Sequence, residues 1–104
     1  MTHPALALDD VVHQRVRLAL LGAITEGRKV EFTFLRDRLD LTDGNLSRHL
    51  QVLEDAGYVR STKGFEGRRP RTWLSVTPLG RQAYRAEIES LKLIVAEFER
   101  RQLG

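Results

Sequence analysis

The chain has 104 residues, of which 41% are hydrophobic and 30% charged, with a net charge of +3 and no cysteine. This length fits one domain, and the lack of cysteine excludes disulfides and thiolate metal sites. No run of 18 apolar residues and no signal-peptide pattern occurs, so we expect a cytoplasmic protein without a membrane span. Its core would be small, so burial against a partner subunit is expected to help.

The positive charge is concentrated in one short segment. Residues 1–60 carry 8 Lys or Arg and 9 Asp or Glu, and residues 82–104 carry 4 of each kind. Residues 61–81 carry 5 Lys or Arg against 1 acidic residue. A local basic stripe can attract phosphate groups. The alternative is an ordinary solvated loop, and the surrounding elements must decide between them.

The first predicted helix begins at Asp9 and Asp10 and runs to about Glu26. Both acids suit a helix N-terminus, and Gly27 suits the position after its end. Residues 1–8 are expected to be a flexible N-terminus. An apolar stripe at helical spacing, widened by further leucines, predicts burial on more than one side. The stripe and the leucines are Val12, Val16, Ala19, Ala23, Leu18, Leu20 and Leu21.

Two short helices follow a brief strand at residues 30–32. Thr33 would cap a helix over residues 34–39, and residues 41–44 form a turn. Thr42 would cap a helix over residues 43–56, which Gly57 ends. At 100° per residue, its leucines 46, 50 and 53 fall within about 60° of one another and define the buried side.

A β-hairpin and a long helix complete the predicted order. Residues 58–62 and 72–76 alternate like strands, and the glycine-rich basic loop between them is too wide for a two-residue turn. Thr77 and Pro78 are a cap and a first-turn proline, which open a helix to about Gln102. We therefore predict an α+β fold, mainly α with a small hairpin. Residues 9–80 would form a winged helix-turn-helix, and residues 81–104 a dimerisation helix.

The residues of the helix-turn-helix and of the wing resemble those of a known family. Leu41 to Val59 reads LTDGNLSRHLQVLEDAGYV, and Gly67 to Gly80 reads GRRPRTWLSVTPLG. Both are similar to MarR/ArsR-like winged-helix regulators, especially the small winged helix DNA-binding domain subgroup, over about residues 14–95. The resemblance implies a DNA-binding regulator, mostly homodimeric and often a repressor. The thiolate and His-rich metal ligands of its metal-sensing relatives are missing, so we expect neither a metal nor a cofactor.

The outer face of the third helix carries the side chains that would read bases. Recognition helices read mainly with their N-terminal residues. Arg can bond guanine, Asn and Gln can bond adenine, and Ser is adaptable. Glycine allows a close approach of the backbone. The predicted readers are Gly44, Asn45, Ser47, Arg48 and Gln51. His49 lies beside the core stripe, so we expect it to pack or cap rather than to read.

The predicted wing supplies the phosphate contacts. Its basic residues are Lys63, Arg68, Arg69 and Arg71, and one arginine could enter the minor groove. Trp73 is expected to anchor the base of the wing by packing. Without such a wing, the polar face of the third helix would be an ordinary solvated surface.

The last helix carries an apolar seam with spacings of 4, 3, 4 and 3 residues, typical of a coiled coil. We predict that this seam pairs with a second copy, together with residues of the first helix. The predicted dimerisation residues are Val16, Leu20, Tyr84, Ile88, Leu91, Val95 and Phe98. The alternative is that the seam packs only on its own domain.

The sequence argues against an enzyme, because no nucleophile–base pair, metal cluster or phosphate-binding glycine loop stands out. A winged-helix module that binds protein without reading DNA is the main alternative. RNA binding is a further one, although single-strand readers usually display more exposed aromatics. The predicted partners are double-stranded DNA and a second copy of the chain. An unidentified small-molecule effector could bind between the first and last helices.

Overall fold

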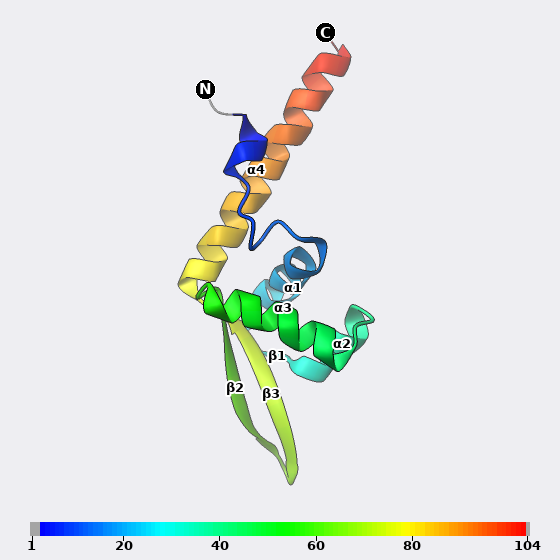
Figure 1. Cartoon of the computed structure of the whole chain (residues 1–104), viewed down its shortest axis with the longest axis vertical. Coiled ribbons are helices and arrows are strands. Elements are labelled where there is room, and N and C mark those ends of the chain that lie inside the picture. Colours follow the sequence, from blue (N-terminus) through cyan, green and yellow to red (C-terminus); the bar gives the residue numbers. More distant parts are fainter. Residues whose placement is uncertain (1–2, 104) are drawn as a thin grey trace.

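The computed structural model describes residues 3–103 and confirms the winged-helix order. Its elements are η1 (Pro4–Ala7), α1 (Arg15–Glu26), β1 (Val30–Glu31), α2 (Phe32–Arg38), α3 (Asp43–Asp55), β2 (Val59–Glu66), β3 (Arg69–Val76) and α4 (Pro78–Leu103). The strands form one antiparallel sheet in the order β1-β3-β2. The molecule measures 62 × 25 × 22 Å, because the β2–β3 wing projects at one end and α4 at the other (Figure 1).

The core lies between the helices α1, α2 and α3 and one face of the sheet. The three leucines of the predicted stripe on α3 are buried, as the helical spacing requires. The remaining buried apolar residues are Val12, Leu20, Leu21, Ile24, Val30, Leu35, Val59 and Leu74. These contacts fix α3 across the base of the wing.

α1 begins later in the chain than the predicted start at Asp9 and Asp10. The helix begins at Arg15, and the Gln14 side chain caps it by accepting from the Arg17 amide. Asp9 does accept from backbone amides, those of Val11 and Val12, but it closes a turn rather than a helix. Val12 is therefore buried from a turn, and Ala19 of the predicted stripe is exposed.

The expectation of a flexible N-terminus is wrong for most of that segment. Residues 4–7 form η1, which packs against α4 (Figure 1). His3 pairs with Glu97 at 3.2 Å. Residues 1 and 2 lie outside the described part of the chain. A contact across more than 90 positions has no local signature, so periodicity could not show it.

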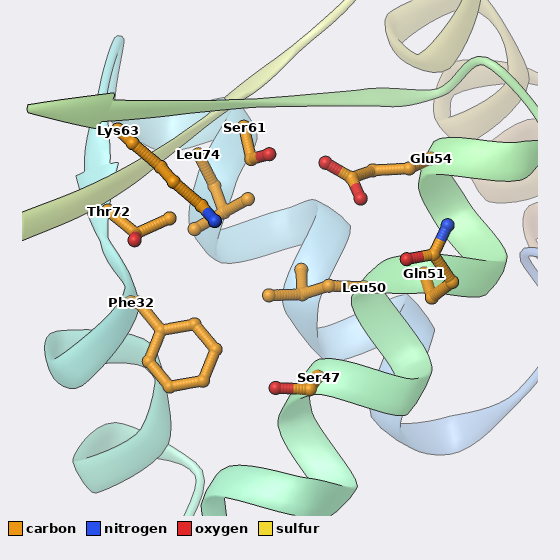
Figure 2. A pocket seen from close by; sticks show the side chains of 9 residues that line it. All are labelled: Phe32, Ser47, Leu50, Gln51, Glu54, Ser61, Lys63, Thr72 and Leu74. Carbon is orange, nitrogen blue, oxygen red and sulfur yellow. The ribbon is translucent and has the colours of Figure 1, made fainter.

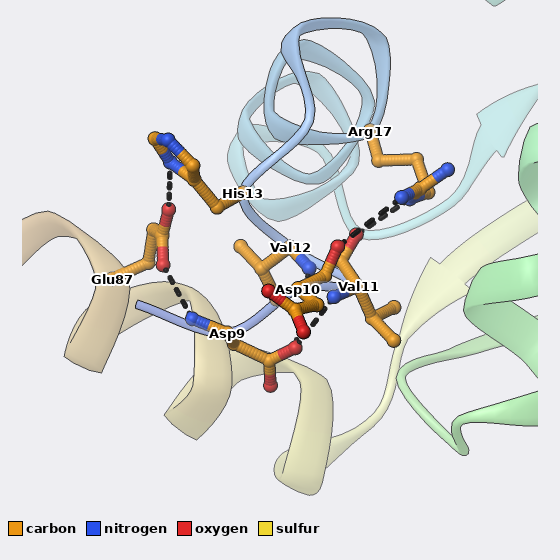
Figure 3. Close-up of polar contacts among 7 residues, drawn as sticks. All are labelled: Asp9, Asp10, Val11, Val12, His13, Arg17 and Glu87. Carbon is orange, nitrogen blue, oxygen red and sulfur yellow. Dashed lines mark hydrogen bonds and ion pairs between the residues drawn. The ribbon is translucent and has the colours of Figure 1, made fainter. Parts of the chain in front are cut away.

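A buried carboxylate holds the segment before α1 against α4. Glu87 is 2% exposed; its Oε1 accepts from the Asp9 amide at 3.2 Å, and its Oε2 lies 2.8 Å from His13 Nδ1 (Figure 3). The Tyr58 hydroxyl donates to Asp9 Oδ2 at 2.6 Å. Burial alone would raise the pKa of Asp9, but this bond and the two amide bonds together lower it. The network joins α4 to the start of the wing.

The two short helices agree with the prediction, with one shift. α2 begins two residues earlier than predicted, at Phe32, so the predicted cap at Thr33 is wrong. Thr33 lies in the first turn instead, where it donates to Glu31. Thr42 caps α3 by accepting from the Asn45 amide at 3.1 Å. Gly57 follows α3 with a φ of 79°, the left-handed backbone that glycine adopts readily.

The hairpin is longer and tighter than predicted. Strand pairing continues to Glu66 and Arg69, so only Gly67 and Arg68 form the turn. Gly67 has a φ of 64°, the conformation of the first central position in a type II′ turn. The expectation of a wide loop is therefore wrong. α4 begins at Pro78 as predicted, and Thr77 accepts from the Gly80 amide at 2.9 Å.

Candidate nucleic-acid interface

The predicted reading face of α3 is open to solvent. All five predicted readers are exposed: Gly44, Asn45, Ser47, Arg48 and Gln51. A Cβ at Gly44 would meet nothing within 4 Å, so a ligand could approach the backbone there. The amphipathic division of α3 is thus confirmed, while base contact by these residues stays a prediction.

Two hydrogen bonds orient the long side chains of this face. Arg48 Nη2 donates to Asn45 Oδ1 at 2.5 Å, and Gln51 Nε2 donates to Asp55 Oδ1 at 2.8 Å. The first bond leaves several guanidinium donors free, because arginine has five N–H groups. Asn45 and Arg48 therefore act as one unit at the start of the helix.

A groove separates α3 from the wing. It has a volume of about 460 Å³ and lies between β2, β3, α3 and the start of α2 (Figure 2). Lys63 points into it from β2, opposite Ser47 and Gln51 of α3 (Figure 2). The remaining lining residues are Phe32, Leu50, Glu54, Ser61, Thr72 and Leu74. The fold thus brings the wing lysine and two predicted readers to one opening.

The other basic residues of the wing divide into two groups. Arg68 and Arg69 are exposed at the tip. Arg71 is half-buried, forms an ion pair with Glu31, and has Nε 3.6 Å from Glu66. Side chains alternate between the faces of a sheet, so Arg71, paired with Gly64 rather than Lys63, lies on the face away from α3. Arg71 therefore links the base of the wing to Glu31 of β1.

Trp73 lies on the same outer face as Arg71. Its ring would meet a Cβ at Gly64 at 3.0 Å, and Lys29 Nζ lies 4.6 Å from the ring centroid. This contact is within cation–π range. The ring thus packs across the base of the wing, as expected. Phe65, by contrast, lies on the same face of the wing as Lys63 and is 72% exposed. No role was predicted for it from the sequence.

A second cluster of basic side chains lies between α1 and α3, and it was not predicted from the sequence. Arg17 of α1 reaches His49, with Nη1 3.3 Å from Nδ1. His49 is half-buried, as a packed histidine should be. Burial, with the charges of Arg17 and Arg48, lowers the pKa of His49. Arg17 and His49 are 32 positions apart, and no sequence spacing indicates this contact.

The predicted seam of α4 is divided between two environments. Tyr84 packs toward α1, where its hydroxyl would lie 3.0 Å from a Cβ at Gly22, and Ile88 and Leu91 are half-buried. Val95 and Phe98 are 54% and 63% exposed. A shallow hollow of about 310 Å³ lies along the seam, lined by Ile88, Leu91, Lys92, Val95, Ala96 and Glu99.

The two predicted dimerisation residues of α1 differ. Leu20 is fully buried in the core of its own chain, so its predicted place at a subunit interface is wrong. Leu20, Leu21 and Ile24 together form the face of α1 that packs into the core. Val16 is half-buried.

Residues 3–103 contain no group of three or more potential metal-ligating side chains. None of the helices in this range is both long and apolar enough to cross a membrane.

Comparison with known proteins identifies the family. A family model described as winged helix DNA-binding domain matches residues 16–95, which include α3, the wing and most of α4. The chain belongs to this family. An uncharacterized protein of Methanocaldococcus jannaschii, MJ0432, is 37% identical over 70 residues, covering 67% of this chain and 76% of MJ0432.

Two solved structures place the fold among transcriptional regulators. A transcriptional regulator homologue of Pyrococcus horikoshii OT3 is 30% identical with a TM-score of 0.86, covering 94% of this chain and 98% of its own. A protein of Enterococcus faecalis V583, described as a transcriptional regulator of the MarR family, is 26% identical with a TM-score of 0.75, covering 95% and 87%. The chain is thus a MarR-like winged-helix protein of the DNA-binding type.

The chain also matches part of an enzyme. A riboflavin kinase of Halobacterium salinarum is 38% identical over 77 residues, which are 74% of this chain and 31% of the kinase. Because the match covers less than a third of the kinase, it fits a winged-helix segment that both proteins share. The family and fold of this chain are those of transcriptional regulators.

Proposed function

We propose that this chain is a homodimeric transcriptional regulator that binds a near-palindromic DNA operator and represses by blocking promoter access. The observation that carries the proposal is the shared opening of α3 and the wing, where exposed Ser47 and Gln51 face Lys63 across one groove (Figure 2). A helix with exposed polar side chains and a basic hairpin are the two parts that contact base edges and phosphates in winged-helix complexes.

The residue roles follow from exposure and chemistry. Asn45, Ser47, Arg48 and Gln51 read base edges, and Gly44 lets the helix start approach the DNA. Lys63, Arg68 and Arg69 bind phosphates. Arg71 binds no phosphate in this proposal, contrary to the sequence-based prediction, because its guanidinium is already paired with Glu31 on the outer face of the wing. The chain performs no catalysis in this proposal.

Replacing the two tip arginines tests the electrostatic part. With three phosphate contacts in each subunit, a dimer should show a slope of log K against log salt of roughly −5. In Arg68→Ala/Arg69→Ala, four contacts are lost, and the slope should become shallower by about 3 to 4 on every duplex. Gel shifts on promoter DNA over a salt series measure this.

The matched control is Arg100→Ala/Arg101→Ala, which removes the same charge from the far end of α4. Equal slopes in the two double variants would contradict the phosphate role of the wing. If the wild type retains no duplex even at low salt, DNA binding itself is excluded, and a protein-binding role for the fold takes its place.

The dimer is supported by the exposed part of the α4 seam. Exposed Val95 lines a hollow whose walls are mainly apolar side chains, and exposed Phe98 lines a second hollow beside His3 and Ile94. At 26 residues, α4 is about 39 Å long. Pairing two such helices would bury this surface and set two copies of α3 about one DNA turn, ~34 Å, apart. The effector pocket expected between α1 and α4 stays a prediction. Where Tyr84 meets Gly22, these two helices are in direct contact.

Placing a charge in the seam tests the dimer. Phe98→Glu should yield a monomer in light-scattering measurements at micromolar concentration, because paired carboxylates would lie in an apolar interface. Operator affinity should fall at least ~100-fold, since the second half-site no longer binds at high effective concentration. Leu103→Glu, at a 90% exposed position near the helix end, should remain dimeric. A dimeric Phe98→Glu would exclude this seam.

A further inference from the structure

Two basic side chains meet on the side of α3 that faces α1, and a third lies one residue away on the outer face of α3. Arg17 comes from α1, while Arg48 and His49 are neighbours on α3. Arg17 contacts the His49 ring, and both arginines act electrostatically on it. The ion pairs found among residues 3–103 include neither Arg17 nor Arg48. We call Arg17, Arg48 and His49 the flank cluster.

The Arg17 guanidinium is held in place by neutral groups. Its Nε donates to the Val11 carbonyl at 2.5 Å, and its Nη2 donates to the Asp10 carbonyl at 3.3 Å (Figure 3). These bonds satisfy donors but leave the positive charge uncompensated. A fixed guanidinium suits a phosphate particularly well, because little side-chain entropy remains to be lost on binding.

The flank cluster and the wing lie on different sides of α3. Ser47, Gln51 and Glu54 line the groove on the wing side. On a helical wheel, His49 lies across the leucine stripe from these three residues, by more than 100°. A helix in the major groove has one phosphate backbone on each side. The wing residues can reach one backbone, which leaves the other for the flank cluster.

We propose that Arg17 and His49 bind a phosphate of the DNA backbone on the side of α3 opposite the wing, while Arg48 beside them stays free to read a base. This site rests on the proposed function and extends it, since it adds one phosphate contact per subunit outside the wing and makes the expected wild-type salt slope roughly −7. It makes Arg17 a DNA ligand contributed by α1. It also makes binding depend on the protonation of His49.

The pH dependence follows from the charges that act on the ring. Burial, together with the charges of Arg17 of α1 and Arg48 of α3, lowers the pKa of His49 and so favours the neutral ring in the free protein. A phosphate beside the ring offsets both arginines and favours the protonated form. Binding therefore takes up protons, and operator affinity should be at least about threefold higher at pH 6 than at pH 8.

The first experiment compares Arg17→Gln with Arg85→Gln, which removes an exposed arginine from α4. Arg17→Gln should make the salt slope shallower by about 2 per dimer, because two phosphate contacts are lost, whereas Arg85→Gln should leave it unchanged. Circular dichroism confirms that both are folded. A folded Arg17→Gln with the wild-type slope overturns the proposal, since Arg17 would then only hold the Val11 and Asp10 carbonyls.

The second experiment uses His49→Gln, which keeps both carbonyl bonds of Arg17 and so tests the site even if Arg17→Gln does not fold. The gain in affinity between pH 8 and pH 6 should disappear in His49→Gln. It should persist in His13→Gln, because His13 is paired with Glu87 on the α4 side. An unchanged pH profile in His49→Gln overturns the proposal.

Titrations followed by the NMR signal of the His49 ring separate the sources of phosphate. Duplex DNA should shift the signal toward the protonated form, and inorganic phosphate at millimolar concentration should not. The reverse result would indicate a free-anion site and overturn the assignment to DNA. If wild-type protein binds no duplex at all, the proposed function fails; if it binds and only these variants behave as wild type, the flank site alone fails.

Discussion

Arg48→Ala is expected to weaken binding to the operator at least about 30-fold while leaving binding to unrelated duplex nearly unchanged. Arg48 is exposed near the start of α3, and Asn45 holds its guanidinium in a defined position. A bidentate contact from arginine to guanine contributes about 1 to 3 kcal/mol of discrimination. A dimer contains two such contacts, so the loss should be at least about 2 kcal/mol. Fluorescence anisotropy with operator and scrambled duplexes measures both affinities.

The control for this prediction is Arg85→Ala, which removes the same charge from the exposed surface of α4. It should change neither affinity by more than about twofold. Asn45→Ala should weaken operator binding as well, and the double variant should lose less than the sum of the single losses, because the two side chains share a hydrogen bond. An equal loss on operator and scrambled DNA would show that Arg48 binds phosphate instead of reading a base.

Gly80→Ala is expected to destabilise the fold by about 3 kcal/mol or more, because it overpacks a site with no room. A Cβ at Gly80 would lie 2.0 Å from the Tyr58 carbonyl oxygen and 2.7 Å from its carbon. Both atoms belong to backbone that is fixed by the bond from the Thr77 amide to the same oxygen, at 3.0 Å. Relief would require α4 to move away from the start of the wing. Urea unfolding of the purified variant measures the loss.

Gly44→Ala is the matched control, since its Cβ would meet nothing within 4 Å and it lies in the first turn of α3. Alanine is favoured over glycine within a helix by about 1 kcal/mol, so this variant should be as stable as the wild type or more so. A cost below about 1 kcal/mol for Gly80→Ala would contradict the close approach of α4 to Tyr58.

The parts that sequence reasoning found are those with local signals. Thr42 lies directly before the leucine stripe of α3, and Thr77 precedes a proline, so both helix starts could be read from neighbouring residues. The reading face of α3 followed from the same stripe, because helical geometry sets the opposite face once the core face is known. The family resemblance supported the same order of elements.

The parts that it missed depend on distant partners. Asp9 and Asp10 have the chemistry of a helix start, yet the Asp9 amide bonds Glu87 and its carboxylate bonds Tyr58, so the chain turns there and α1 begins later. Arg71 was grouped with the tip arginines because the turn was expected to be wide. Once the turn is placed at Gly67 and Arg68, strand alternation puts Arg71 on the outer face.

The flank cluster shows the same limit in the site itself. The charge count along the chain assigned the electrostatic contact to the wing, where basic residues follow one another closely. Arg17 lies in a segment whose charges nearly balance, and only the packing of α1 against α3 brings it to His49.

Selection of duplexes from fragmented genomic DNA by the purified wild-type protein tests the central claim most directly. The enriched fragments are predicted to share an inverted repeat with half-site centres about 10 base pairs apart, and binding to them should weaken steeply as salt is raised. Recovery of no common sequence at low salt, or of a single half-site without its inverted copy, would contradict the account of a dimer that reads DNA with α3.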